Sequence, residues 1–214
     1  MRLVLGNNSY EFFNDISLSL KYNAIASQLG FKAYFDPQDE SHKKLFKPLA
    51  YDVVKLYHED ELLFTGRKIS SSFKSSAVPS LATFSGYSLT GVLEDCDIPI
   101  SLYPIQFDGL SLKEITERLI KPFGISLVVD DIVKKEAETV YETVDADPSG
   151  SVRDFIVKLA AQRSIIVSST RGGSLLLTKT KAGNKPIADL SDATEKTLTV
   201  NGQPLHSSIT VISE

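Results

Sequence analysis

Residues 111–129 read SLKEITERLIKPFGISLVV, and at this stretch the hydrophobic period of the chain changes from two to helical. Ser111 and Glu114 have the spacing of a capping box, in which the serine side chain accepts from the Glu114 amide and the glutamate reaches back. The predicted helix carries one apolar stripe: Leu112, Ile115, Leu119 and Ile120. Pro122 ends it, and residues 125–129 follow as a strand.

The same pattern returns in residues 151–167, SVRDFIVKLAAQRSIIV. Ser151 caps a second predicted helix, whose apolar stripe is Val152, Phe155, Ile156, Leu159 and Ala160. A strand at residues 165–167, a turn at residues 171–173 and a second strand at residues 175–178 complete the unit. The pattern predicts a small α/β domain over residues 102–188, in which two helices cover the same face of one sheet.

Before this domain the chain shows many short segments of period two, which predict strands. From Asp15 the apolar residues Ile16, Leu18, Leu20 and Tyr22 alternate with Ser17, Ser19 and Lys21. Residues 53–57 and 62–66 flank an acidic turn and read as a hairpin. Further strands are predicted at residues 31–35 and around residues 69 and 82–84. Close turns between short strands are typical of a barrel or sandwich.

A surface loop is predicted at Pro37 and the charged run 39–44, where His42 is expected to be a solvated side chain. At the other end of the chain, residues 197–211 read as a hairpin around Asn201-Gly202. We expect this tail to return to the first sheet. The predicted class is therefore α+β: a β-barrel domain of residues 1–101, completed by residues 189–214, with residues 102–188 inserted.

The bulk properties exclude several classes of protein. The chain has 214 residues, 42% of them hydrophobic, and a formal net charge of −4. A duplex nucleic-acid binder normally carries a basic excess, so sequence-specific nucleic-acid binding is not expected. The N-terminus lacks the apolar core of a signal peptide, and no window is long enough for a membrane segment. We therefore expect the protein to be made and kept in the cytosol until it is assembled or released.

No motif for catalysis, cofactor binding or metal binding is present, so no catalytic, cofactor or metal residue is predicted. Cys96 is the only cysteine and is expected to be a small buried hydrophobe, because His42, His58 and His206 lie in unrelated settings. The acidic run 130–147 includes Glu136, Glu138 and Glu142, carboxylates that a hydrolase or a hard metal could use. Without fixed spacing, a solvated loop or edge strand is the favoured interpretation.

Four segments, taken in order, resemble the baseplate hub proteins of Mu-like contractile-tail phages, which are related in fold to the T-even phage hub and the type VI secretion spike protein. They are residues 63–66, 85–96, 119–125 and 147–178. In the second, Asp95 and Cys96 match the family, whereas Tyr87 stands where an arginine is often found. In the fourth, Ser164 replaces a usual glycine.

This resemblance, which covers residues 50–180, implies a structural protein and no enzyme. It implies a trimeric ring that links the tail tube to the spike, with a first domain that is similar to a tube subunit. The protein would be cytoplasmic during assembly and then part of the virion tail. The alternatives are a tail-associated hydrolase of peptidoglycan or carbohydrate, and a monomeric ligand-binding barrel with a deep apolar pocket.

If the chain is such a hub, its first sheet must offer a surface to neighbouring subunits. Residues 15–22 are the candidate, because their polar side carries only serine and lysine. An ordinary barrel strand exposes the same small polar residues to water, so both interpretations stay open from the sequence.

Overall fold

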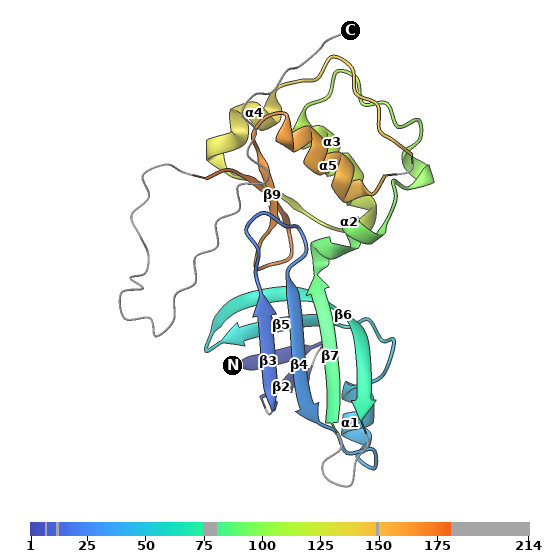
Figure 1. Cartoon of the computed structure of the whole chain (residues 1–214), viewed down its shortest axis with the longest axis vertical. Coiled ribbons are helices and arrows are strands. Elements are labelled where there is room, and N and C mark those ends of the chain that lie inside the picture. The colour runs from blue at the N-terminus through green and yellow to red at the C-terminus, as the bar shows by residue number, and fades with distance from the viewer. Residues whose placement is uncertain (7, 12, 75–80, 149, 181–214) are drawn as a thin grey trace, which may run out of the picture. The chain divides into compact units, whose positions relative to one another are not determined.

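The computed structural model describes residues 1–6, 8–11, 13–74, 81–148 and 150–180, and it contains two β-sheets (Figure 1). The larger sheet has seven strands in the order β2-β1-β5-β6-β7-β4-β3, and every neighbouring pair is antiparallel. Its strands are β1 Arg2–Leu5, β2 Asn8–Tyr10, β3 Asp15–Ser19, β4 Gln28–Tyr34, β5 Val53–His58, β6 Glu61–Lys74 and β7 Leu81–Ser88. Figure 1 shows this sheet curled into a half-barrel.

The inner face of the curled sheet is apolar because buried and exposed residues alternate along its strands. In β4, Leu29, Phe31 and Ala33 are buried, whereas the residues between them are more exposed. The Phe31 and Phe84 rings stack with 4.9 Å between their centroids, and Phe46 stacks on Phe84 at 4.8 Å. Burial of such side chains is the main stabilising contribution to the sheet.

The predicted hairpin of β5 and β6 is confirmed, with its turn at Glu59 and Asp60. In the described part of the chain the sheet is open, and β2 and β3 are its two edges. The predicted return of residues 189–214 to this sheet lies outside the described residues, so closure of a barrel stays a prediction.

The predicted loop around Pro37 is wrong in part, because a helix, α1 Glu40–Leu45, forms within the charged run. The expectation of a solvated His42 is also wrong. Its Nδ1 accepts a hydrogen bond from the Asp36 amide at 3.1 Å, and its ring lies against the rings of Phe35 and Phe46. The charged sequence hid this packing, which depends on residues outside the helix.

The second sheet has three strands in the order β8-β10-β9. Strand β10 runs antiparallel to β9, as the predicted hairpin requires, and parallel to β8. The elements of this part are α2 Val92–Asp95, α3 Leu112–Ile120, β8 Leu127–Val129, α4 Lys134–Glu138, α5 Val152–Ala161, β9 Ile166–Ser169 and β10 Leu175–Thr178. Short 3₁₀ turns cover Leu89–Gly91, Ile100–Leu102, Lys121–Phe123 and Asp131–Val133. Met1–Lys179 form one compact unit.

Both predicted helix starts are confirmed. Ser111 and Glu114 form the capping box, with the Ser111 amide donating to Glu114 Oε2 at 2.9 Å. Ser151 Oγ accepts from the Asp154 amide at 3.1 Å. The two apolar stripes are buried, and they share one core with Leu175 and Leu177 of β10. Helix α3 contacts α5 and β8, and α5 also contacts β9.

The α+β class is confirmed at this level, while the inserted arrangement of the second part stays a prediction. The acidic run 130–147 is not the solvated loop or edge strand expected, because it contains the buried Val133 and Ala137 and the helix α4. No helix in the described part of the chain is long and apolar enough to cross a membrane.

Replacing either capping serine by alanine should lower the free energy of unfolding by about 0.5–2 kcal/mol, because each change removes an acceptor for a helix amide. Ser111→Ala should cost more than Ser151→Ala, since Ser111 is buried and its hydroxyl also donates to Glu114 at 2.6 Å. Urea denaturation measures both. Ser85→Ala, at an exposed strand position, is the control and should change little. Unchanged midpoints for both caps would contradict the assigned helix starts.

Ser164, at the position where a glycine is usual in the resembling family, has a φ of +54° just after α5. The left-handed conformation is unfavourable for a residue with a Cβ atom, whereas glycine adopts it without steric strain. Ser164→Gly should therefore raise the free energy of unfolding by about 0.5–1 kcal/mol, despite the greater entropy of glycine in the unfolded chain. Ser85→Gly, where φ is not positive, should destabilise. Equal effects of the two changes in urea denaturation would refute the assigned strain.

Candidate assembly surface

Strand β3 is an edge of the curled sheet, because β4 is its strand partner within the described residues. On the outer side of an edge strand, the backbone N–H and C=O groups have no neighbouring strand to bond to. Proteins commonly protect such edges with proline, lysine or a bulge. Strand β3 reads DISLS, so its only charge is Asp15 at its start. The predicted surface of residues 15–22 thus begins at an open and weakly protected edge.

The side chains of β3 alternate between the two faces of the sheet. Ile16 and Leu18 are half-buried and pack against the core of the curled sheet, whereas Ser17 and Ser19 are exposed on the outer face. The predicted orientation is therefore confirmed for residues 16–19. It is wrong for Leu20 and Tyr22, which lie beyond the end of β3 and are exposed. Exposure in the single chain agrees both with a solvated strand and with a face that another subunit covers.

One row of the outer face is built from small uncharged residues, whereas the row beside it carries longer side chains. Strand register places Ser17, Gly30, Ser85 and Ser70 in one row across β3, β4, β7 and β6. The next row contains Ser19, Gln28, Tyr87 and Arg67. The first row has few long side chains to immobilise on contact, so the entropic cost of covering it is low.

Gly30 keeps this face flat. A Cβ atom at Gly30 would lie 2.7 Å from Ser17 Oγ, closer than real Cβ contacts come. Beside it lies a shallow depression of about 430 Å³, whose lining includes Ser17, Ser19, Ile69 and Ser85. The structure therefore places a flat, shallowly hollowed surface where the sequence predicted a contact face.

Tyr87 connects this face to the helix α2. Its hydroxyl donates to Asp95 Oδ2 at 2.9 Å, and its ring lies against Gly91, where a Cβ atom would come within 2.4 Å of the ring. Burial, together with the hydrogen bond to Asp95 and the charge of that carboxylate, raises the pKa of Tyr87 to about 12. Arg67, its register partner on β6, acts in the opposite direction. The tyrosine thus bridges the sheet and the following helix.

The two sheets also meet near the end of β3. Ser27 Oγ and Ser169 Oγ are 3.5 Å apart, and the Arg171 guanidinium donates to the carboxylate of Glu61. A cavity of about 310 Å³ lies here, lined among others by Lys21 and Tyr22. Arg171 thus joins the turn after β9 to the hairpin of β5 and β6.

Two of the three acidic residues considered for catalysis, Glu136 and Glu138, are held in ion pairs at the surface, and Glu142 is exposed. Lys179 donates to Glu136 Oε1 at 2.8 Å, and this hydrogen bond lowers the pKa of Glu136. Glu138 lies 3.5 Å from the Lys113 ammonium. A general acid would need a raised pKa instead. Among the residues that the structure describes, no group of His, Cys, Asp and Glu could hold a metal ion.

Cys96 is half-buried after α2, and so is more exposed than the small core residue that was expected. His42 lies in the aromatic part of the curled sheet, and His58 is exposed at the end of β5. His206 lies outside the described residues. Cys96, His42 and His58, the candidates within the described residues, therefore lie in separate settings.

Sequence reasoning missed Lys68, which is 3% exposed within the curled sheet. Its ammonium donates to the Lys47 carbonyl at 2.8 Å and lies 3.9 Å from Asp52 Oδ2. Burial lowers its pKa, an effect that Asp52 partly opposes. Nothing in the local sequence marks this one lysine. Gly30 was also missed, although an isolated glycine within a strand pattern is a usable signal.

Residues 90–179 match the family model described as the second domain of gp44-like baseplate hub proteins. No curated protein matches the chain. The family model covers α2 to β10, including both capped helices.

Two solved structures have a similar fold. The 43 kDa tail protein of prophage MuSo2 from Shewanella oneidensis is 22% identical, with a TM-score of 0.71 over 85% of this chain and 56% of that one. A tail protein from Neisseria meningitidis MC58 is 15% identical, with a TM-score of 0.71 over 87% of this chain and 52% of that one. The chain thus spans about half the length of these proteins. The predicted resemblance to Mu-like baseplate hub proteins is confirmed.

The shifted pKa of Tyr87 predicts a late step in a spectrophotometric titration. In the folded protein Tyr87 keeps its proton up to about pH 12, whereas an unfolded tyrosine ionises near pH 10. Stability from this group is present below pH 10 and is lost as the pH rises toward 12. Tyr87→Phe should remove one tyrosine from the step near pH 12 in the absorbance at 295 nm, whereas the control Tyr103→Phe should keep it. Identical late steps in the two variants would contradict the Tyr87–Asp95 interaction.

Proposed function

We propose that this chain, which carries a gp44-like second domain at residues 90–179, is a structural component of a phage or prophage tail baseplate hub. In this role it joins the tail tube to the spike. The observation that carries the proposal is the family match over the same residues that form the three-stranded sheet and its two capped helices. We infer that the chain is assembled in the cytoplasm and then forms part of the virion tail.

We infer further that the role is not catalytic. The ion pairs of Glu136 and Glu138 support this, because carboxylates paired with lysines at the surface are poor general acids. The polar cleft with facing carboxylates that would favour a hydrolase has no counterpart among the described residues. A monomeric ligand-binding barrel is not favoured either, because the depressions of about 430 and 440 Å³ on the curled sheet are open to solvent.

The working form in this proposal is a homotrimer, with the outer face around Ser17 and Ser19 covered by a neighbouring subunit. The flat row of small side chains supports this, because such a face packs closely and requires little ordering. Closed cyclic symmetry is the usual arrangement of such assemblies. The tail tube and the spike would then contact the ends of the ring.

The same proposal includes the domain organisation predicted from the sequence. In that organisation residues 102–188 are inserted into a first domain made of residues 1–101 and 189–214. The burial of Leu93 and Ile98 in the second core, and the family match from residue 90, favour a first boundary near residue 90. The open edge of β3 supports the return of residues 189–214, because it offers a ladder to a returning segment while its outer face stays available to a neighbour. In this proposal the edge of β3 pairs with the returning segment, and the outer face of β3 contacts the neighbouring subunit.

Glutamates at Ser17 and Ser19 should break the proposed contact, because they place like charges in a covered face. Light scattering should give three times 23.5 kDa for the wild type and a folded monomer for Ser17→Glu/Ser19→Glu. In the encoding phage or prophage, electron microscopy should find tails without complete baseplates.

The matched control is Ser101→Glu/Gln162→Glu, which adds the same charge at two exposed positions outside the curled sheet and should leave the trimer intact. A trimer that survives the change at Ser17 and Ser19 rules out this face. A wild type that stays monomeric at high concentration counts against the hub proposal as a whole.

A further inference from the structure

The segment between α1 and β5 contains two strained residues. Leu49 has a φ of +55° and Tyr51 a φ of +50°, although neither is glycine. Each such conformation costs on the order of 1–2 kcal/mol and persists only where surrounding contacts impose it. Residues 47–51, which we name the docking loop, are therefore held in a shape that they do not prefer.

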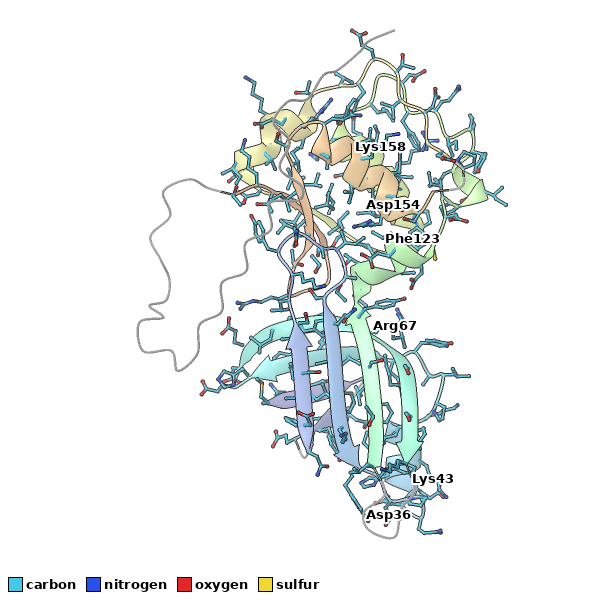
Figure 2. The ribbon with its side chains drawn as sticks, viewed as in Figure 1. Asp36, Lys43, Arg67, Phe123, Asp154 and Lys158 are labelled. Atoms are coloured by element: carbon cyan, nitrogen blue, oxygen red, sulfur yellow. The ribbon has the colours of Figure 1, made fainter. Side chains whose placement is uncertain are left out.

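Two neighbouring residues of β6 impose that shape. Arg67 Nη1 donates to the Tyr51 carbonyl at 2.9 Å, and the buried Lys68 ammonium donates to the Lys47 carbonyl at 2.8 Å. The Lys68 amide also donates to the Asp52 carbonyl at 3.0 Å. The loop thus runs from α1, where Figure 2 labels Lys43, to the part of β6 where it labels Arg67. We call Arg67 and Lys68 with these hydrogen bonds the clamp. Burying the Lys68 ammonium lowers the free energy of unfolding, so the clamp fixes the loop while it makes the fold less stable.

The clamp presents apolar side chains to the outside. Leu49 is 74% exposed and Tyr51 is 48% exposed. Lys44 and Lys47, which precede Leu49 in the chain, are exposed and cationic, while the partly exposed Asp52 follows Tyr51. A rigid apolar tip with a basic surround fits an apolar hollow with acidic residues at its rim, because both the shape and the charge are then complementary.

Such a hollow exists on the same curled sheet. A depression of about 440 Å³ is lined by the rings of Tyr10, Phe13, Tyr34 and His42 together with Glu11 and Asn14. Its walls are braced from below, since the Tyr10 and Phe46 rings meet edge to face at 5.5 Å. Glu11 is exposed at its rim, and Glu40, exposed on the adjoining helix α1, is paired with Lys43 at 2.6 Å. We name this depression the aromatic hollow.

We propose that the docking loop of one copy of this chain inserts Leu49 into the aromatic hollow of a second copy, with Lys44 and Lys47 facing Glu11 and Glu40. This proposal rests on the homotrimer of the proposed function and adds a second contact between its subunits, beside the covered outer face around Ser17 and Ser19. Loop and hollow are formed by different residues, so the contact is heterologous. Repeated around an axis, such a contact closes into a ring.

Mixed disulfide formation tests the contact directly. Cys96→Ser first removes the only cysteine. In that background, Leu49→Cys and Tyr34→Cys are prepared separately, both at exposed positions, then mixed with oxidised glutathione. The expected product is a disulfide-linked dimer that forms in the mixture at levels well above those of either variant alone. Dimers from Leu49→Cys alone at the same level, or none in the mixture, would overturn the proposal.

A charge substitution provides the second arm. Leu49→Glu should raise the dissociation constant of self-association by about tenfold or more, as expected for loss of a central apolar anchor. Ile100→Glu is the matched control, because Ile100 is 87% exposed and lies outside both surfaces. Circular dichroism checks that both variants are folded.

The possible failures are separable. A wild-type trimer that Leu49→Glu leaves intact overturns the docking loop and leaves the hub proposal standing. A wild type that is monomeric overturns both. A trimer lost equally in Leu49→Glu and Ile100→Glu overturns the specific contact, because the effect then does not depend on the loop.

Discussion

The backbone carbonyl of Ile25 is the point on which the placement of the two sheets depends. It accepts hydrogen bonds from Ser88 Oγ at 2.9 Å and from Thr90 Oγ1, and all three residues are buried. The Ser27 amide donates back to Ser88 Oγ at 3.1 Å. A carbonyl without such partners in this setting would cost about 1–3 kcal/mol, so the link between β3–β4 and the end of β7 is strongly specified. The Ile25 side chain meanwhile belongs to the core of the helices α3 and α5.

The second half of the chain was predictable because its signals are local. A capping serine, a stripe at helical spacing and a following glycine lie within one turn or two of each other, and these fix where a helix begins, which face it buries and where it ends. Even the exception at Ser164 was visible in the sequence. The turn after the helix requires a positive φ, which serine adopts at a cost in free energy that glycine does not have. Family likeness and local physics agree over these residues because both reflect the same few constraints.

The curled sheet was predictable only as a set of strands. Alternation gave the two faces of β3, but its place at an edge follows from pairings between residues far apart in sequence, such as β4 with β7. The ring packing of His42 and the burial of Lys68 have the same origin, because their partners come from other segments. For the same reason the sequence predicted only residues 15–22 as an assembly surface. The row from Ser17 to Ser70 crosses four strands and could be seen only once the strand register was known.

The curled sheet carries features that are unfavourable in an isolated chain. It has an open edge with little protection, two left-handed residues in one loop, a buried lysine that holds this loop, and apolar side chains exposed at its tip. Each of these lowers the stability or solubility of a monomer, although the Lys68 ammonium also lies over the core ring of Phe84. The helical part, by contrast, is capped and packed without such strain except at Ser164. A protein that works inside an assembly can tolerate a less stable curled sheet beside a stable helical part. Contacts with neighbouring subunits can offset the lost stability at the strained residues.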